Sequence, residues 1–121
     1  MGYEMRFYVV NKMPVKDQIE NGEFYYGQTI AMYDYCCDYY LADFINKNSK
    51  PTDTYIYVGE EQVVKDCYGE FLAEININDL LEYLHNDKEE YRRKLPFIKM
   101  LEGFKEEKHH FEHLAILRYG Y

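Results

Sequence analysis

The stretch TYIYVGEEQVVKDCY, residues 54–68, decides the fold that the sequence predicts. Residues 54–58 are β-branched or aromatic and predict a strand, and residues 59–61 predict a turn. Residues 62–68 then return as the second strand of a hairpin, and residues 71–75 favour a further strand. The middle of the chain therefore predicts an antiparallel meander.

The chain before this meander predicts two short strands, over residues 5–11 and 24–26. Between them, Pro14 suits the first position of a short helix over residues 15–20. We expect that helix to end at Asn21-Gly22, because both residues tolerate a left-handed cap.

A longer helix is predicted over residues 29–46, where apolar side chains recur at helical spacing. Asp34 is also a good N-cap, so an alternative leaves residues 29–33 extended and begins the helix later. Residues 46–51, rich in Asn, Lys and Ser and ending in Pro, predict a loop.

After the meander, Asn78 is the expected N-cap of a helix over residues 79–85, with a second helical piece through Arg93. Pro96 suits the first position of a third helix, although Gly103 weakens its later turns. Residues 111–119 predict a final strand that pairs with residues 5–11, and the alternative is a continuation of the third helix.

These elements predict one α+β domain over residues 1–121, in which three or four helices pack mainly on one face of an antiparallel sheet of about four to six strands. The predicted core consists of apolar residues on the helical stripes and strands: Leu41, Phe44, Ile56, Val58, Leu81, Leu84, Phe97 and Leu101.

Composition favours a cytoplasmic protein. The first residues contain charge and no apolar signal region, no stretch is apolar enough to span a membrane, and the three cysteines form no disulfide framework. Residues with AT-rich codons greatly outnumber those with GC-rich codons, which favours a low-GC bacterium or its phage as the source.

Motifs for catalysis or cofactors are weak. His109 and His113 have the spacing of metal ligands on a helix, but Cys36 and Cys37 are adjacent, and neighbouring side chains on a helix diverge by about 100°. Gly-rich phosphate-binding patterns are absent. We expect no cofactor and no metal.

The most unusual feature is an acidic middle rich in tyrosine. The net charge is −8, and residues 13–87 hold 15 acids against four lysines, with nine tyrosines over residues 25–68. Packing at the core boundary is one explanation for these rings. The other is a contact surface, since Tyr gives large, rigid contact area and binds cations.

The sequence therefore favours a non-enzymatic interaction protein with a basic protein partner, for example a phage or mobile-element inhibitor of a nucleic-acid-binding enzyme. Its negative charge argues against direct nucleic-acid binding, and a homo-oligomer remains open. The expected surface consists of Tyr25, Tyr26, Asp34, Tyr35, Asp38, Tyr39, Asp43, Glu60 and Glu61.

The alternative is a small-ligand-binding or enzymatic domain with a polar site near the C-terminus. Basic and imidazole side chains gather there, and this site would use Arg92, Arg93, His109, His110, His113 and Arg118.

Overall fold

Two long strands form the centre of the molecule. In the computed structural model, which describes residues 4–35, 39–87, 94–107, 111 and 113–121, β1 (Met5–Ile19) and β2 (Gly22–Tyr35) pair as an antiparallel hairpin. Glu20 and Asn21 form the turn, both with positive φ (52° and 62°), as expected for the two central residues of a type I′ hairpin turn.

The predicted helix over residues 15–20 is therefore wrong. Asn21 tolerates the left-handed conformation as expected, but here it turns a hairpin instead of capping a helix. The helix over residues 29–46 is also wrong in its first part. The alternative is correct in leaving residues 29–33 extended, but Asp34 is not an N-cap, because β2 continues through Tyr35. Every second side chain, at positions 31, 33 and 35, faces the helices, as in a strand. Pairing of β2 with β1 therefore favours the two-residue period of a strand over the helical period.

The sheet has seven strands in the order β3-β6-β7-β1-β2-β4-β5. Its remaining strands are β3 (Lys50–Pro51), β4 (Thr54–Val58), β5 (Glu61–Val63), β6 (Ala73–Ile75) and β7 (Leu114–Gly120). The terminal strand pairs with β1 from Met5↔Gly120 to Asn11↔Leu114, which confirms that prediction.

The sheet is mixed, because β4 runs parallel to β2. The expectation of an antiparallel sheet of about four to six strands is met in part, because the other strand pairs are antiparallel but β2 and β4 are parallel and the sheet has seven strands. The 54–68 hairpin is confirmed in a shorter form: Val58 pairs with Glu61 across Gly59, which has φ of 66°, and β5 ends at Val63.

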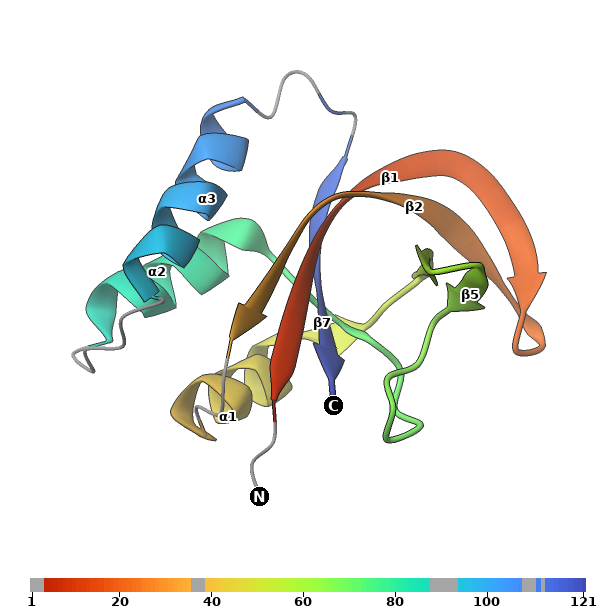
Figure 1. Cartoon of the computed structure of the whole chain (residues 1–121), viewed down its shortest axis with the longest axis horizontal. Helices are drawn as coiled ribbons and strands as arrows, with labels where there is room; N and C mark the ends of the chain where they lie inside the picture. The colour runs from red at the N-terminus through yellow and green to blue at the C-terminus, as the bar shows by residue number, and fades with distance from the viewer. Residues whose placement is uncertain (1–3, 36–38, 88–93, 108–110, 112) are drawn as a thin grey trace.

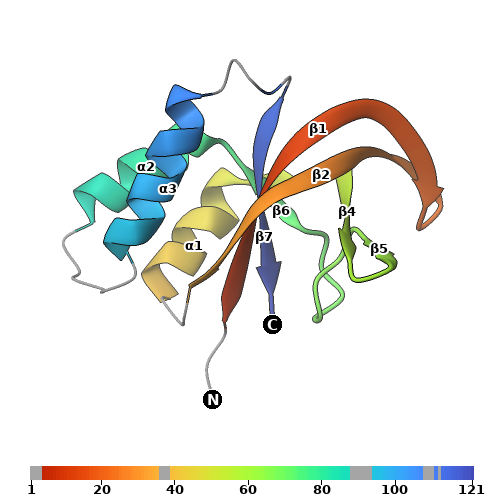
Figure 2. The same ribbon diagram turned by 45° about the horizontal axis from the view of Figure 1, so that its top comes forward.

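Three helices cover one face of this sheet, α1 (Tyr39–Asn48), α2 (Ile77–Asn86) and α3 (Lys94–Glu106), as Figures 1 and 2 show. Asn76, and not Asn78, caps α2, and its side chain accepts from the backbone N–H groups of Asn78 and Asp79. Pro96 lies in the first turn of α3, where a missing N–H is tolerated. The predicted helical piece through Arg93 lies outside the described residues.

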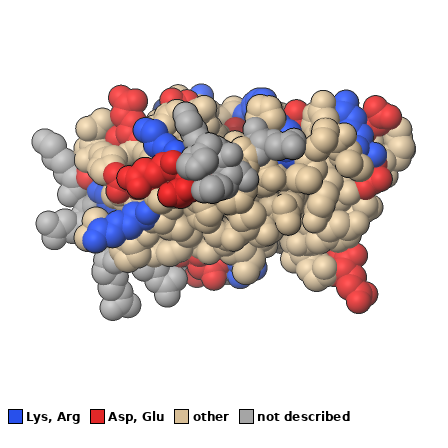
Figure 3. All heavy atoms as spheres, turned by 90° about the horizontal axis from the view of Figure 1, so that it is seen from above, with Lys and Arg blue, Asp and Glu red and all other residues tan. Residues whose placement is uncertain are grey.

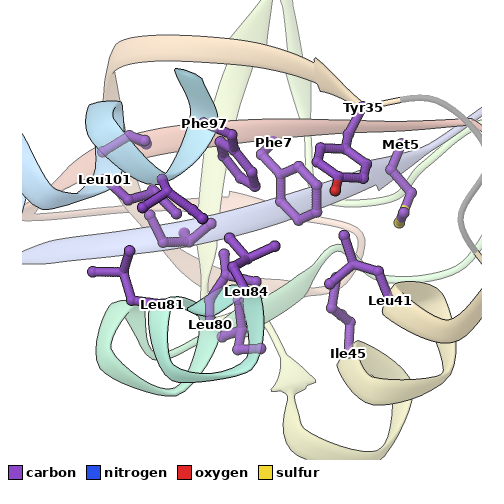
Figure 4. Packing of buried hydrophobic residues seen from close by; sticks show 14 of the residues in the cluster. Met5, Phe7, Tyr35, Leu41, Ile45, Leu80, Leu81, Leu84, Phe97 and Leu101 are labelled. Carbon is purple, nitrogen blue, oxygen red and sulfur yellow. The ribbon is translucent and has the colours of Figure 1, made fainter. Parts of the chain in front are cut away.

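The larger core fills the space between the helices and the sheet. Phe97 of α3 packs on Phe7 and stacks on Tyr33, with ring centroids 5.0 and 4.9 Å apart, and Leu residues from all three helices close around them (Figure 4). Six of the eight predicted core residues are buried, whereas Phe44 and Val58 are half-buried at the margins.

A second core lies on the other face, because the sheet curls. Leu72 donates its backbone N–H to the Val64 carbonyl at 2.9 Å, and Lys65 bridges to Phe71, so the chain after β5 meets the chain before β6. The curl encloses Tyr8, Val10, Ile56, Leu72, Ala115 and Leu117. The far halves of β1 and β2 form an arm, residues 12–27, that arches over the β4–β5 hairpin (Figure 1).

Candidate interaction surface

Three tyrosine rings meet where the arm crosses the hairpin. Register pairs Tyr26 of β2 with Tyr55 of β4, and Tyr57 follows two residues later on the same side of β4. The three ring centroids lie 5.6 to 5.9 Å apart. The parallel pairing of β2 with β4 therefore creates an aromatic cluster from segments about thirty residues apart.

The central ring of this cluster is fixed and the outer rings are accessible. Tyr55 is 3% exposed, and its hydroxyl donates a hydrogen bond to the Asp17 carboxylate of β1. Burial, together with this bond, raises the pKa of Tyr55 above its ordinary value. Tyr57 is 46% exposed and Tyr26 is half-buried, so both offer ring area to a partner.

Two carboxylates lie at the turn of the hairpin that carries Tyr57, and cross-strand register pairs Tyr57 with Gln62 and Val58 with Glu61, which places the Glu61 side chain on the opposite face of the hairpin from the Tyr57 ring. Glu60 and Glu61, in and next to the hairpin turn, are both exposed and form no ion pair with any residue that the structure describes. We define the tyrosine–acid surface as Tyr26, Tyr57, Glu60 and Glu61. It combines accessible aromatic rings with negative charge that the fold does not neutralise.

Tyr25, another ring of the arm, already forms cation–π contacts with two lysines of β1. The Nζ atoms of Lys16 and Lys12 lie 4.6 and 5.7 Å from its centroid, both within the range of cation–π attraction. Tyr25 is thus occupied inside the molecule and is not part of the tyrosine–acid surface.

The other predicted surface residues do not join this surface. Tyr35 is 1% exposed and belongs to the core, so it is not available to a partner. Asp34 accepts from Arg6 at 2.7 Å and from the Tyr121 hydroxyl at 3.3 Å. The hydrogen bond to Asp34 raises the pKa of Arg6, so the guanidinium stays positively charged. This positive charge compensates the negative charge of the Asp34 carboxylate.

Helix α1 carries two more of the predicted residues. Tyr39 is 67% exposed at its start, and Asp43 pairs with Lys47 at 2.9 Å. They belong to a different element from the arm and the hairpin, and Asp38 lies outside the described residues.

A charged cluster fixes the base of the arm. Lys12 lies 2.7 Å from Asp53 and 3.5 Å from Glu74, and Glu74 also contacts Lys50 at 3.7 Å and the Thr52 hydroxyl at 3.1 Å. Burial alone would raise the pKa of Asp53, but hydrogen bonds from Lys12 and Thr54 lower it overall. Each carboxylate has a cation, so the cluster has the geometry of a structural network.

The alternative C-terminal site is not assembled among the described residues. His113 is exposed just before β7, whereas Arg118 is buried near the end of β7, where its Nη1 donates to the Asn46 side chain at 2.9 Å. Five residues of extended strand, roughly 16 Å, separate the two. Arg92, Arg93, His109 and His110 lie outside the described residues.

Two open depressions lie away from the tyrosine–acid surface. One, of about 410 Å³, includes Lys50, Glu74 and Asp79, and the other, of about 550 Å³ between α2 and α3, includes His85 and Glu102. Within the described part of the chain, no group of His, Cys, Asp and Glu side chains is placed to hold a metal ion. Likewise, none of its helices is both long and apolar enough to cross a membrane.

Charged side chains are unevenly distributed over the surface. Figure 3 shows a broad area with few charges across the middle of the molecule, between charged groups at the helical end and at the arm end.

Comparison with protein-family models, curated proteins and solved structures found no match. The arrangement of side chains is therefore the basis for a functional proposal.

The sequence did not single out three residues of this site: Asp17, Tyr55 and Tyr57. The alternation of Tyr55 and Tyr57 in a strand places both rings on one face, and that was visible in the sequence. Their meeting with Tyr26 depends on strand pairing across the sheet, which no local pattern specifies.

Proposed function

We propose that this protein is a non-enzymatic binding protein whose tyrosine–acid surface recognises a basic protein partner. The observation that carries the proposal is that Tyr57, a 46%-exposed member of the three-tyrosine cluster, lies in the same hairpin as Glu60 and Glu61. Arg and Lys side chains are attracted both to aromatic faces and to carboxylates, so they suit this combination.

The free charges favour recognition of a basic partner over a neutral one. Glu60 and Glu61 have no cation among the described residues, and a partner that supplies one gains an ion pair without first breaking another. The same charge repels nucleic-acid phosphates. A nucleic-acid-binding enzyme is one partner class with a suitably basic surface, and the protein would then act as an inhibitor that competes with nucleic acid.

A defined peptide tests the proposal. We expect an arginine-rich ten-residue peptide to bind with an affinity that falls steeply with salt, because charges on the surface are screened over about 10 Å at 0.1 M. Tyr57→Ala removes an exposed ring and is expected to weaken binding at least tenfold, on the order of 2 kcal/mol for an anchor residue. Isothermal titration calorimetry measures both effects.

The matched control changes the same charge elsewhere. Glu60→Gln with Glu61→Gln and Glu106→Gln with Glu107→Gln each neutralise two adjacent exposed acids. We expect only the hairpin pair to weaken the peptide several-fold. Equal effects of the two pairs, or binding that does not change with salt, would remove the proposal.

A further inference from the structure

The strand that carries Tyr26 continues into a sheet edge that is open on one side. β2 pairs with β1 along its length, but β4 pairs with it only at Tyr25 and Tyr26. Beyond that point, residues 28–32 form no backbone hydrogen bond with any described residue other than those of β1. Met32 is 57% exposed and Gln28 and Thr29 are also exposed, so this edge is accessible.

The free edges of β3 and of the far half of β1 are protected, and this one is not. Sheet edges are commonly guarded against pairing by Lys, Pro or strong irregularities. In the far half of β1, Pro14 and Lys16 lie where the register with β2 shifts, between Lys12 and Lys16. Strand β3 consists only of Lys50 and Pro51. β2 contains no Lys, Arg or Pro, and residues 17–46 contain no basic residue at all. Its only irregularity among residues 28–32 is a one-residue bulge at Ile30.

We propose that an extended, basic segment of the partner pairs with residues 28–32 of β2 and adds a strand to the sheet. The inference rests on the proposed function and names how the partner is held: main-chain hydrogen bonds supply affinity along the edge. The partner's basic side chains then reach the tyrosine–acid surface, which begins at Tyr26 on the same strand.

Charge decides between this partner and a second copy of the chain. A protein with net charge −8 repels its own copy. A basic segment instead meets an edge with no positive charge to repel it. The continuity of this edge with Tyr26 favours one partner that covers both.

Two peptides of equal charge separate main-chain pairing from charge recognition. The first is a capped ten-residue peptide of alternating arginine and threonine, and the second has N-methyl groups on its six central amides. We expect the methylated peptide to bind at least tenfold more weakly, because it has lost the donors that an added strand needs. Hydrogen exchange should slow at the amides of residues 28–32 only with the first peptide.

Variants of the protein supply the matched control. Thr29→Lys on the open edge is expected to weaken the unmethylated peptide, and Val15→Lys, an exposed position on the guarded strand, to leave it within twofold. Equal binding of both peptides overturns the added strand but leaves the proposed function intact, whereas binding of neither overturns both. Sedimentation showing a dimer that Thr29→Lys dissociates would make a second copy the occupant, and would also overturn this inference.

Discussion

At the scale of single residues, the substitution Gly→Ala is expected to have opposite effects on the stability of the fold at Gly27 and at Gly103. A Cβ at Gly27 would lie 2.6 Å from Thr54 Cγ2 and 3.0 Å from the Tyr55 carbonyl, so β2 passes β4 only because Gly27 has no side chain. Gly27→Ala is expected to destabilise the fold by about 1–3 kcal/mol through overpacking. Gly103, exposed on α3, has open space, and Gly103→Ala should stabilise by about 1 kcal/mol.

The free energy of unfolding in denaturant measures both changes. A Gly27→Ala variant as stable as the parent would mean that β2 and β4 do not approach as described. The Gly103→Ala variant serves as the control, because it makes the same chemical change in a helix.

At the scale of elements, the turn of the arm is the feature that the sequence misassigned. Asn21 has φ of 62°, a conformation that costs most residues about 1–2 kcal/mol and Asn or Gly much less. We expect Asn21→Ala to lower the free energy of unfolding by about 1 kcal/mol and Asn21→Gly to leave it nearly unchanged. Gln18→Ala, elsewhere in the arm, is the control, and equal losses for all three would contradict the turn.

The error over residues 15–35 has a physical cause. Short local patterns there are compatible with both periods, and Asn-Gly suits a helix cap as well as a hairpin turn. Pairing of β2 with β1 decides the matter, and such pairing is non-local. The 54–58 strand and the helices α2 and α3 were predictable because their own sequences carry a clear pattern, whereas the last strand also had a helical alternative.

At the scale of the whole molecule, the sheet brings together residues of the tyrosine–acid surface that are far apart in the sequence. The sequence pointed to Tyr26, Glu60 and Glu61, but it gave equal weight to Tyr35, which the core encloses. Tyr57 enters the surface only through the parallel pairing of β2 with β4. Acid and aromatic content were therefore readable from composition, whereas their arrangement depends on the curl of the sheet.

The tyrosine–acid surface is tested most directly by mapping the bound peptide on the protein. Amide chemical shifts of the ¹⁵N-labelled chain, followed by NMR during titration with the arginine–threonine peptide, locate the contact residue by residue. We expect the largest changes at Tyr26, Tyr57, Glu60 and Glu61, together with residues 28–32 where the added strand pairs, and we expect them to fade as salt is raised. Largest changes in the groove between α2 and α3, at His85 and Glu102, with the hairpin unaffected, would contradict this expectation.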